Sequence, residues 1–528
     1  MAYPPLNPSG PISLGGSVSG QSVNLAVGQS ATASISFNSS VTRLITGTNA
    51  GTQLTMPTDF YGKSFTPATS TFIYDAGNLW AIYVRVVATY NSTGDYFLAG
   101  AATNTSTSAT YAYVAKFNSA GVLQWQKTYT DGGTSTLFIA GTANNLYATV
   151  DQSTGHLYAI GYVSGGNGLI AKLDGSTGAV LWKWQVAPAP TEQTAPICVT
   201  VDSAGNALVL FQRANTSTPM QAGYLLKFNS SGSLQWQRQT NEYYLWAYHA
   251  NITTDSSNNI YISSSVRDPA TTYRGINMTK LDSSGFFLWC KNLTQTTRVG
   301  GMDADAATSA ISSAGRLYVS GYLYGGSSGV DQYLFTACIA ELDTSTGATV
   351  NTYCFRPSAM TGTTNTIYNM VTSPAGDVYC TFSHPNNSDW GYGIARFPAN
   401  LSAPTWAGAW EGYYSPSTGL RGFLVTGLGY IGNSYILVGD GNLGAPYKYG
   451  AVAFQMPNDG SNTGNKVFST LNSYGYDSFS SSSLAALTPG ITNVNLTPTI
   501  YVGTAGVSST SLSTVALPGT LTTEVRAQ

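Results

Sequence analysis

Charged side chains are scarce in this chain of 528 residues, because Asp, Glu, Lys and Arg together make up only 9% of it. The formal net charge is -2, which argues against the clustered Lys and Arg that contact nucleic-acid phosphates. Disordered chains combine high net charge with few aromatic residues, whereas 12% of this chain is aromatic. We therefore expect a folded, apolar interior and no binding to nucleic acid.

Long apolar runs are also missing. No run approaches the roughly 18 residues that cross a bilayer, so we expect no membrane insertion. The start, MAYPPLNPSGPISLGG, has neither the basic region nor the continuous apolar region of a secretory signal. The sequence therefore predicts synthesis in a reducing cytoplasm.

Cysteine is rare and odd in number, with five residues that lie mostly in apolar, strand-like runs: Cys198, Cys290, Cys338, Cys354 and Cys380. Buried thiols are the expectation for such positions. Cys338 and Cys354 could lie on adjacent strands and pair, but the sequence alone does not establish the distance between them.

Residues that carry catalysis are few. The three histidines, His156, His249 and His384, do not have a metal-binding spacing such as HExxH, and no GxSxG, P-loop or Rossmann phrase occurs in a usable context. Asp303 and Asp305 form the only close acidic pair in the connecting loops, and an oxygen-rich loop can bind Ca²⁺. Because no full ligand set accompanies them, we expect a hydrated surface loop. The sequence thus predicts no catalytic residue, no metal, no cofactor and no enzyme.

What the chain does contain is a phrase repeated seven times. Four clear copies are AKFNSAGVLQW, AKLDGSTGAVLW, LKFNSSGSLQW and TKLDSSGFFLW, and three fainter copies follow. We call the residue in the lysine position of each copy its marker residue. Successive marker residues are 53 to 61 positions apart: Lys116, Lys172, Lys227, Lys280, Glu341, Arg396 and Gln455. Each repeat contains four strand-like segments, which in the third repeat begin at Ile197, Ala207, Gly223 and Leu234. Four short antiparallel strands per unit predict an all-β fold, the β-propeller.

The connections within a repeat are unequal. The turns between strands one and two and between strands three and four are short and contain Asp or Ser followed by Gly, as in DSAG from Asp202. Loops between strands two and three vary in length and sequence. Since consecutive hairpin turns alternate between the two edges of a blade, the short turns share one edge and the variable loops share the other. Function is expected at the variable edge.

The two ends of the chain are predicted to close the ring. The segment TFIYDAG from Thr71 resembles a fourth strand without its own first three, and residues 476–521 supply strand-like pieces. We predict seven complete blades over about 80–470, plus a composite closing blade from 70–76 and 476–521, which makes eight. Seven blades with a separate C-terminal tail is the alternative.

Residues 1–64 do not fit the repeat, and residues 65–528 are assigned to the propeller. Alternating apolar residues, such as Val23, Leu25 and Val27, predict a small β module ahead of the ring.

Two resemblances to known families follow from these residues. LDSSGFFLW from Leu281 and FNSSGSLQW from Phe228 resemble bacterial β-propeller repeats, including those of quinoprotein dehydrogenases, although the adjacent cysteines of a quinoprotein are absent. The stretch from PSGPISLGG to DFYGKS at Asp59 resembles a module at the start of virion structural and tail-appendage proteins of marine and cyanobacterial bacteriophages. The second resemblance implies docking to other virion proteins, with Phe60, Tyr61 and Gly62 as docking residues.

Aromatic residues fall into two groups. Tryptophans that follow the marker residue by 9 or 10 positions should pack between blades: Trp125, Trp182, Trp236, Trp289 and Trp406. Irregular aromatics in the variable loops are the candidate ligand contacts: Tyr243, Tyr244, Trp246, Tyr273, Trp390 and Tyr392. Trp246 and Trp80 both occur in the phrase Leu-Trp-Ala, so a recurring structural anchor is the other interpretation of Trp246.

Together these features predict a non-enzymatic phage virion protein of tail-fibre or appendage type, present in several copies per particle, that attaches to host-surface glycan. A purely architectural tail or capsid component is one alternative. A polysaccharide-degrading tail enzyme is another, but it would need paired carboxylates, and the 24 acidic residues lie mostly in turns.

Overall fold

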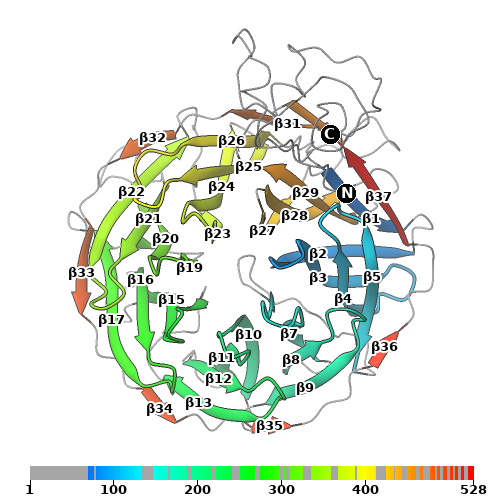
Figure 1. Cartoon of the computed structure of the whole chain (residues 1–528), viewed down its shortest axis with the longest axis horizontal. Helices are drawn as coiled ribbons and strands as arrows, with labels where there is room; N and C mark the ends of the chain where they lie inside the picture. The colour runs from blue at the N-terminus through cyan, green and yellow to red at the C-terminus, as the bar shows by residue number, and fades with distance from the viewer. Residues whose placement is uncertain are drawn as a thin grey trace, which may run out of the picture.

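The chain forms a ring of seven antiparallel sheets in a computed structural model (Figure 1). The structure describes these residues: 69–75, 79–131, 147–163, 167–187, 192–215, 222–240, 250–267, 274–295, 302–303, 308–324, 335–357, 367–386, 389–411, 424–432, 434–442, 449–458, 464–467, 476–481, 484–487, 491–495, 500–502, 506–508, 513–515 and 521–527. Every regular element among them is a strand. The predicted all-β propeller of four-stranded blades is therefore confirmed.

Blades 1 to 3 each contain four consecutive strands, numbered from the centre outward. Blade 1 contains β2 (Trp80–Tyr90), β3 (Asp95–Asn104), β4 (Thr110–Phe117) and β5 (Leu123–Thr130). Blade 2 contains β6 (Ala148–Val150), β7 (Leu157–Tyr162), β8 (Gly168–Leu173) and β9 (Val180–Ala187). Blade 3 contains β10 (Glu192–Val201), β11 (Ala207–Asn215), β12 (Ala222–Phe228) and β13 (Leu234–Thr240), as the sequence predicts.

Blades 4 to 6 follow the same plan. Blade 4 contains β14 (Asn251–Thr254), β15 (Ile260–Arg267), β16 (Arg274–Leu281) and β17 (Phe287–Gln295). Blade 5 contains β18 (Met302–Asp303) and β19 (Ser309–Ile311), which both pair with β20 (Leu317–Tyr324), then β21 (Phe335–Leu342) and β22 (Thr349–Pro357). Blade 6 contains β23 (Ile367–Thr372), β24 (Val378–Asn386), β25 (Asp389–Phe397) and β26 (Trp406–Glu411).

Blade 7 is built from both ends of the repeat region. It contains β27 (Leu424–Ile431), β28 (Ser434–Asn442) and β29 (Tyr449–Pro457), and its fourth strand is β1 (Thr69–Asp75). β1 pairs antiparallel with β29 from Thr69 opposite Gln455 to Ile73 opposite Ala451. Closure of the ring by an N-terminal strand is thus confirmed. The prediction of eight blades is wrong, because β1 is the fourth strand of the seventh blade and does not close an eighth.

The C-terminal segment encircles the ring. Its strands are β31 (Tyr476–Ser481), β32 (Leu484–Leu487), β33 (Ile491–Asn495), β34 (Ile500–Val502), β35 (Gly506–Ser508), β36 (Ser513–Val515) and β37 (Leu521–Ala527), and β30 (Gly464–Val467) pairs with β31. They add an outer strand to blades 6, 5, 4, 3, 2, 1 and 7 in that order (Figure 1). We call residues 476–527 the C-terminal strap. The predicted composite blade from 70–76 and 476–521 is therefore wrong.

The repeated phrase joins each blade to the next. In blade 3, Gly232 has a φ of +88°, and the Cβ of any other residue there would lie 2.7 Å from Cγ of Trp182 in blade 2. The Trp182 indole N–H and the Lys172 ammonium both donate to the Ser230 carbonyl, at 3.1 and 3.0 Å. The Gly of one copy therefore fits against the Trp of the preceding copy, which explains why both recur. The predicted packing of the regular tryptophans between blades is confirmed.

The same contacts recur around the ring. Tryptophan N–H groups donate to the next blade in the pairs Trp125–Gly175, Trp289–Thr344 and Trp406–Asn458. Turn glycines with positive φ face the preceding tryptophan in the pairs Gly178–Trp125, Gly285–Trp236 and Gly347–Trp289. Marker cations donate to a turn carbonyl of the next blade in the pairs Lys227–Ser283, Lys280–Thr344 and Arg396–Asn458.

Most blades also hold a charge pair near this turn. Lys227 lies 2.9 Å from the Asp202 carboxylate within blade 3, with both side chains largely buried. Blade 5 has the opposite arrangement, since the marker position is Glu341 and its partner is Arg316, at 2.9 Å. Arg316 also donates to the Ala399 carbonyl of blade 6, so the link between blades survives the exchange of charges.

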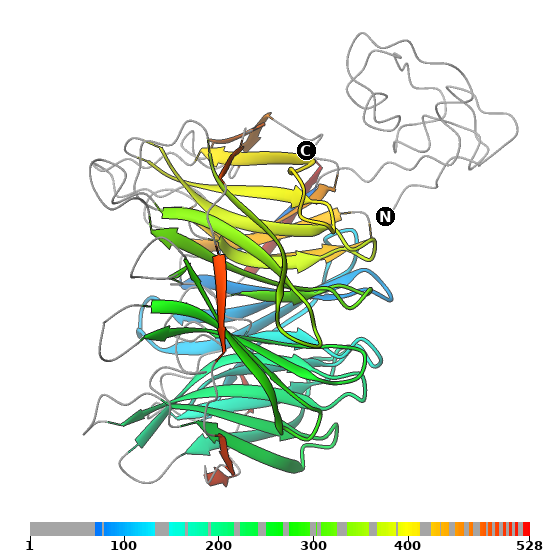
Figure 2. The same ribbon diagram turned by 90° about the vertical axis from the view of Figure 1, so that its left-hand side faces the viewer.

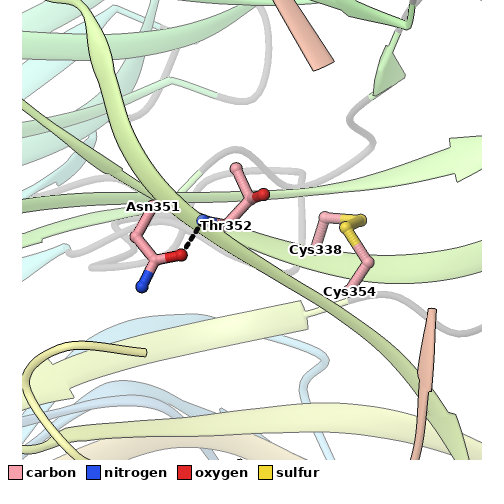
Figure 3. Close-up of a disulfide and its surroundings, with 4 residues drawn as sticks. All are labelled: Cys338, Asn351, Thr352 and Cys354. Carbon is pink, nitrogen blue, oxygen red and sulfur yellow. Dashed lines mark hydrogen bonds between the residues drawn. A yellow bond between two sulfur atoms is a disulfide. The ribbon is translucent and has the colours of Figure 1, made fainter. Parts of the chain in front are cut away.

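A disulfide joins Cys338 and Cys354, which lie directly opposite each other on β21 and β22 (Figure 3). Beside it on β22, the Thr352 amide donates to the Asn351 side chain at 2.9 Å. Cys198, Cys290 and Cys380 lie outside this bond and are buried, as the sequence predicts. No helix in the described residues is long and apolar enough to cross a membrane.

Candidate functional site at the loop edge

The two edges of the ring differ in the way the sequence predicts. One edge, which we call the tight-turn edge, carries the turns between strands one and two and between strands three and four. In blade 3, for example, the Gly205 amide donates to the Asp202 carbonyl and the Gly232 amide to the Asn229 carbonyl. Figure 2 shows the ring from the side, with coloured hairpin turns gathered along its right-hand edge. We call the opposite edge the loop edge.

At the loop edge, the hairpin of blade 1 is described throughout, and in the other blades the structure describes the paired strand ends. In blade 1, Thr103 pairs with Thr110, and the Asn104 side chain accepts the amides of Ser106 and Thr107 at 2.9 and 3.1 Å. In blade 6, β24 and β25 pair as far as Asn386 opposite Asp389. Trp390 and Tyr392, which the sequence analysis assigns to a variable loop, thus lie on a strand.

Tyr392 is the candidate contact residue whose side chain the structure describes best. It lies on β25 and is half-buried against the apolar cluster between blades 6 and 7. Its ring centroid is 5.8 Å from that of Tyr368, which occupies a bulge in the innermost strand of the blade. Tyr368 was not predicted, and its place in a strand bulge, which no sequence repeat marks, explains why. Both rings lie toward the loop edge of blade 6.

The other predicted contacts are described only in part or not at all. Trp390 lies on β25 opposite Pro385, two residues closer to the hairpin than Tyr392, and only its backbone is described. Tyr243, Tyr244, Trp246 and Tyr273 lie outside the described residues, as do Phe60, Tyr61 and Gly62. The structural anchor predicted at Trp80 is 4% exposed and packs against Tyr111, with centroids 5.8 Å apart.

Polar residues, all of them buried except the half-buried Asn369, mark the inner strands of three neighbouring blades. Within each of blades 4, 5 and 6, a polar residue of the first strand is paired with a polar residue of the second: Asn251–Ser263, Thr308–Ser320 and Asn369–Thr381. The equivalent pair in blade 3 is Cys198 and Leu210. The Ser263 hydroxyl donates to the Ser309 hydroxyl of blade 5 at 3.3 Å. The sequence does not reveal this seam, because Ser and Thr are also common in turns and on exposed faces. The polar contacts are made within the seam, which indicates a packing role.

The carboxyl groups whose pKa values are shifted lie at the tight-turn edge. Burial opposes ionisation of Asp202, but hydrogen bonds from Asn206 and Lys227 outweigh it and hold the pKa of this carboxyl below its usual value. Burial raises the pKa of Glu341, against the opposing effect of Arg316. These carboxyls serve the blade contacts and do not face the loop edge.

No group of three or more His, Cys, Asp and Glu side chains in the described part of the chain could hold a metal ion. Of the predicted acidic pair, Asp303 pairs with Tyr322 through the backbone of β18, and Asp305 lies outside the described residues. The described side chains toward the loop edge include the rings of Tyr368 and Tyr392 in blade 6 and the hydroxyls of Thr103 and Thr110 in blade 1.

Comparison with known proteins does not identify a family for this chain. No family model matches the chain, and a search of curated proteins found no match. Similar solved structures include a protein of unknown function from Dyadobacter fermentans, with a TM-score of 0.40, 9% identity, and coverage of 74% of this chain and 99% of that one. Drosophila Semaphorin 1b, extracellular domains 1-2, has a TM-score of 0.35 and 8% identity, covering 60% and 86%.

Polysaccharide lyase Uly1 has a TM-score of 0.36 and 8% identity, covering 62% of this chain and 91% of that one. At these identities and TM-scores, neither an activity nor a ligand transfers to this chain.

Proposed function

We propose that this chain is a non-enzymatic bacteriophage virion protein of tail-fibre or appendage type. Residues 1–64 dock to other virion proteins, and the propeller presents its loop edge to host-surface glycan. The resemblance of the first 64 residues to phage virion modules supports the viral assignment. The protein is made in the host cytoplasm and resides in the particle in several copies.

The observation that carries this proposal is the place where the N-terminal segment joins the ring. β1 begins at Thr69 opposite Gln455, the marker residue beside the tight turn of blade 7. β1 therefore starts at the tight-turn edge and ends at the loop edge. A particle that holds residues 1–64 is then joined to the edge opposite the variable loops. Docking and display use different faces of one rigid ring.

Attachment to glycan is supported by the chemistry available at the loop edge. Aromatic rings pack against sugar rings, and Tyr392 and Tyr368 supply two of them at blade 6. The half-burial of Tyr392 in the cluster between blades 6 and 7 fixes its ring before a ligand arrives, which lowers the entropic cost of binding.

The docking half of the proposal is tested by deletion. A chain lacking residues 1–64 retains β1, so it is expected to fold as the complete propeller and to be missing from assembled particles. A chain lacking residues 1–78 also loses β1 and serves as the control for an open ring. Incorporation of the first variant into particles at the normal level would show that the docking assignment is wrong.

The display half is tested by binding to a glycan array with analysis of the products. We expect retention of at least one host-surface glycan, no cleavage of it, and weaker binding by Tyr392→Ala. The conservative variant Tyr392→Phe preserves the ring and should bind nearly as well. Cleaved products would identify an enzyme instead. A particle map with the loop edge fully covered by other subunits would identify an architectural component.

A further inference from the structure

We propose that the C-terminal strap is a clamp that holds the propeller ring closed from outside, and that its last strand, β37, locks the N-terminal strand β1 into blade 7. This inference concerns the ring itself and is independent of what the propeller binds. It rests on the pairing of all seven blades with one continuous segment.

The strap crosses the boundaries between blades. β31 pairs with β26 of blade 6, β32 with β22 of blade 5, and β33 with β17 of blade 4, and the order continues to blade 7. Consecutive strap strands are joined by short linkers, from two residues (482–483) to five (516–520). Two adjacent blades therefore cannot separate widely unless at least one strap strand first leaves its blade.

The strap reinforces the ring most at the place where it is closed. β1 pairs with β29 over five residues, from Thr69 to Ile73, and with β37 over seven, from Thr69 to Asp75. Both neighbours are antiparallel to β1 and lie on its opposite sides. The next strand in sequence, β2, belongs to blade 1. Within blade 7, β1 is therefore held in the sheet by its two neighbours, β29 and β37. Loss of β37 leaves β1 as an edge strand.

The strap also covers edges that would otherwise be open. The outermost strand of a blade presents unpaired N–H and C=O groups, which can pair with another chain. In blades 3 and 4 the strap pairs with the second half of the outermost strand, at Arg238–Thr240 and Lys291–Gln295. These halves lie nearest the loop edge. Release of the strap is therefore expected to promote association between copies.

Its order suggests that the strap closes stepwise. The first strap strand pairs with blade 6, which is close in sequence, and each later strand is tethered by the pairing before it. Closing a short linker costs less entropy than closing a long loop. The strap can thus pair progressively from blade 6 to blade 7 once the seven blades have formed.

The test removes residues 521–528 from the full chain, with removal of Gln528 alone as the matched control, because β37 ends at Ala527. Opening of the ring is measured as the rate of protease cleavage in the segment 76–79 that links β1 to β2. We expect the rate to rise by about tenfold or more without β37, since β1 then has fewer hydrogen bonds to break. The control should match the complete chain.

A rescue experiment separates ring closure from general destabilisation. Thr71 and Ala453 are paired residues of β1 and β29, and both are buried. A disulfide between Thr71→Cys and Ala453→Cys joins β1 to its other neighbour. Oxidation should return the cleavage rate of the shortened chain to within about twofold of the complete chain, since the cross-link replaces the constraint that β37 supplied. The reduced form of the same variant is the control.

The proposal is overturned if the shortened chain is cleaved at the same rate as the control, or if the cross-link fails to lower an increased rate. In the second case β37 would stabilise the fold without closing the ring. The size of the shortened chain in solution gives an independent measurement. We expect it to form dimers or larger species, and a strictly monomeric chain would refute the edge-covering role.

Discussion

Replacing Gly232 by alanine should damage the contact between blades 2 and 3 more than its backbone conformation alone would suggest. Gly232 has a φ of +88°, where a residue with a Cβ is strained by about 1–2 kcal/mol. Its added Cβ would lie 2.7 Å from Cγ and 2.8 Å from Cδ2 of Trp182. Overpacking of this kind costs about 1–3 kcal/mol more. The expected loss of unfolding free energy is about 2–5 kcal/mol.

Gly315 supplies the matched control, because it has a φ of +75° in a turn of the same edge but has no neighbouring atom within 4 Å of the Cβ position. Gly315→Ala should therefore cost only the backbone strain, about 1–2 kcal/mol. Denaturant unfolding followed by far-ultraviolet circular dichroism measures both variants without relying on the perturbed tryptophan. Equal losses for the two variants would refute the idea that turn glycines lock the blades.

Three further predictions follow from the tight-turn edge and the core. Lys227→Met should lower the unfolding free energy by about 3–5 kcal/mol, because it leaves the buried Asp202 carboxylate without its cation. Adding Asp202→Asn should recover part of this loss in a double-mutant cycle, and strict additivity would contradict the pairing. Stability should fall as the pH drops below about 4, the range of unfolded aspartate. The reason is that folding lowers the pKa values of Asp202 and Asp343, that of Asp343 to about 2. The ionised carboxylates therefore stabilise the folded state at neutral pH, and this stabilisation is lost as they become protonated at low pH. A melting temperature that rises on acidification would contradict this sign. The buried thiols should react with a thiol reagent only after unfolding, and fast labelling of the native protein would exclude their burial: Cys198, Cys290 and Cys380.

Much of the fold could be predicted from the sequence because its determinants are local. The turn DSAG and the strands beside it in blade 3 are specified by residues close together in the chain, and all four strands lie where expected. The regular spacing of Trp182 and its equivalents likewise indicated contacts between blades. A periodic pattern carries this information because each repeat packs against an adjacent repeat with the same pattern.

The candidate site was less predictable. Tyr392 was identified as an irregular aromatic in a variable segment, but its neighbour Tyr368 lies 24 positions earlier, in a different strand. The hydrogen bonds between the polar residues of blades 4 and 5 depend on side chains from separate repeats facing one another. Contacts of this kind are set by register and by the rotation from one blade to the next, which single positions do not reveal.

The sequence by itself determined the repeat, the four-stranded blade, the two unequal edges and the closure of the ring by an N-terminal strand. Those features depend on hydrophobic alternation and turn chemistry, which act over a few residues. Only the tertiary structure decided that there are seven blades and that residues 476–527 surround them. Where a short strand pairs depends on which sheet edge is open, and that is known only when all the blades are in place.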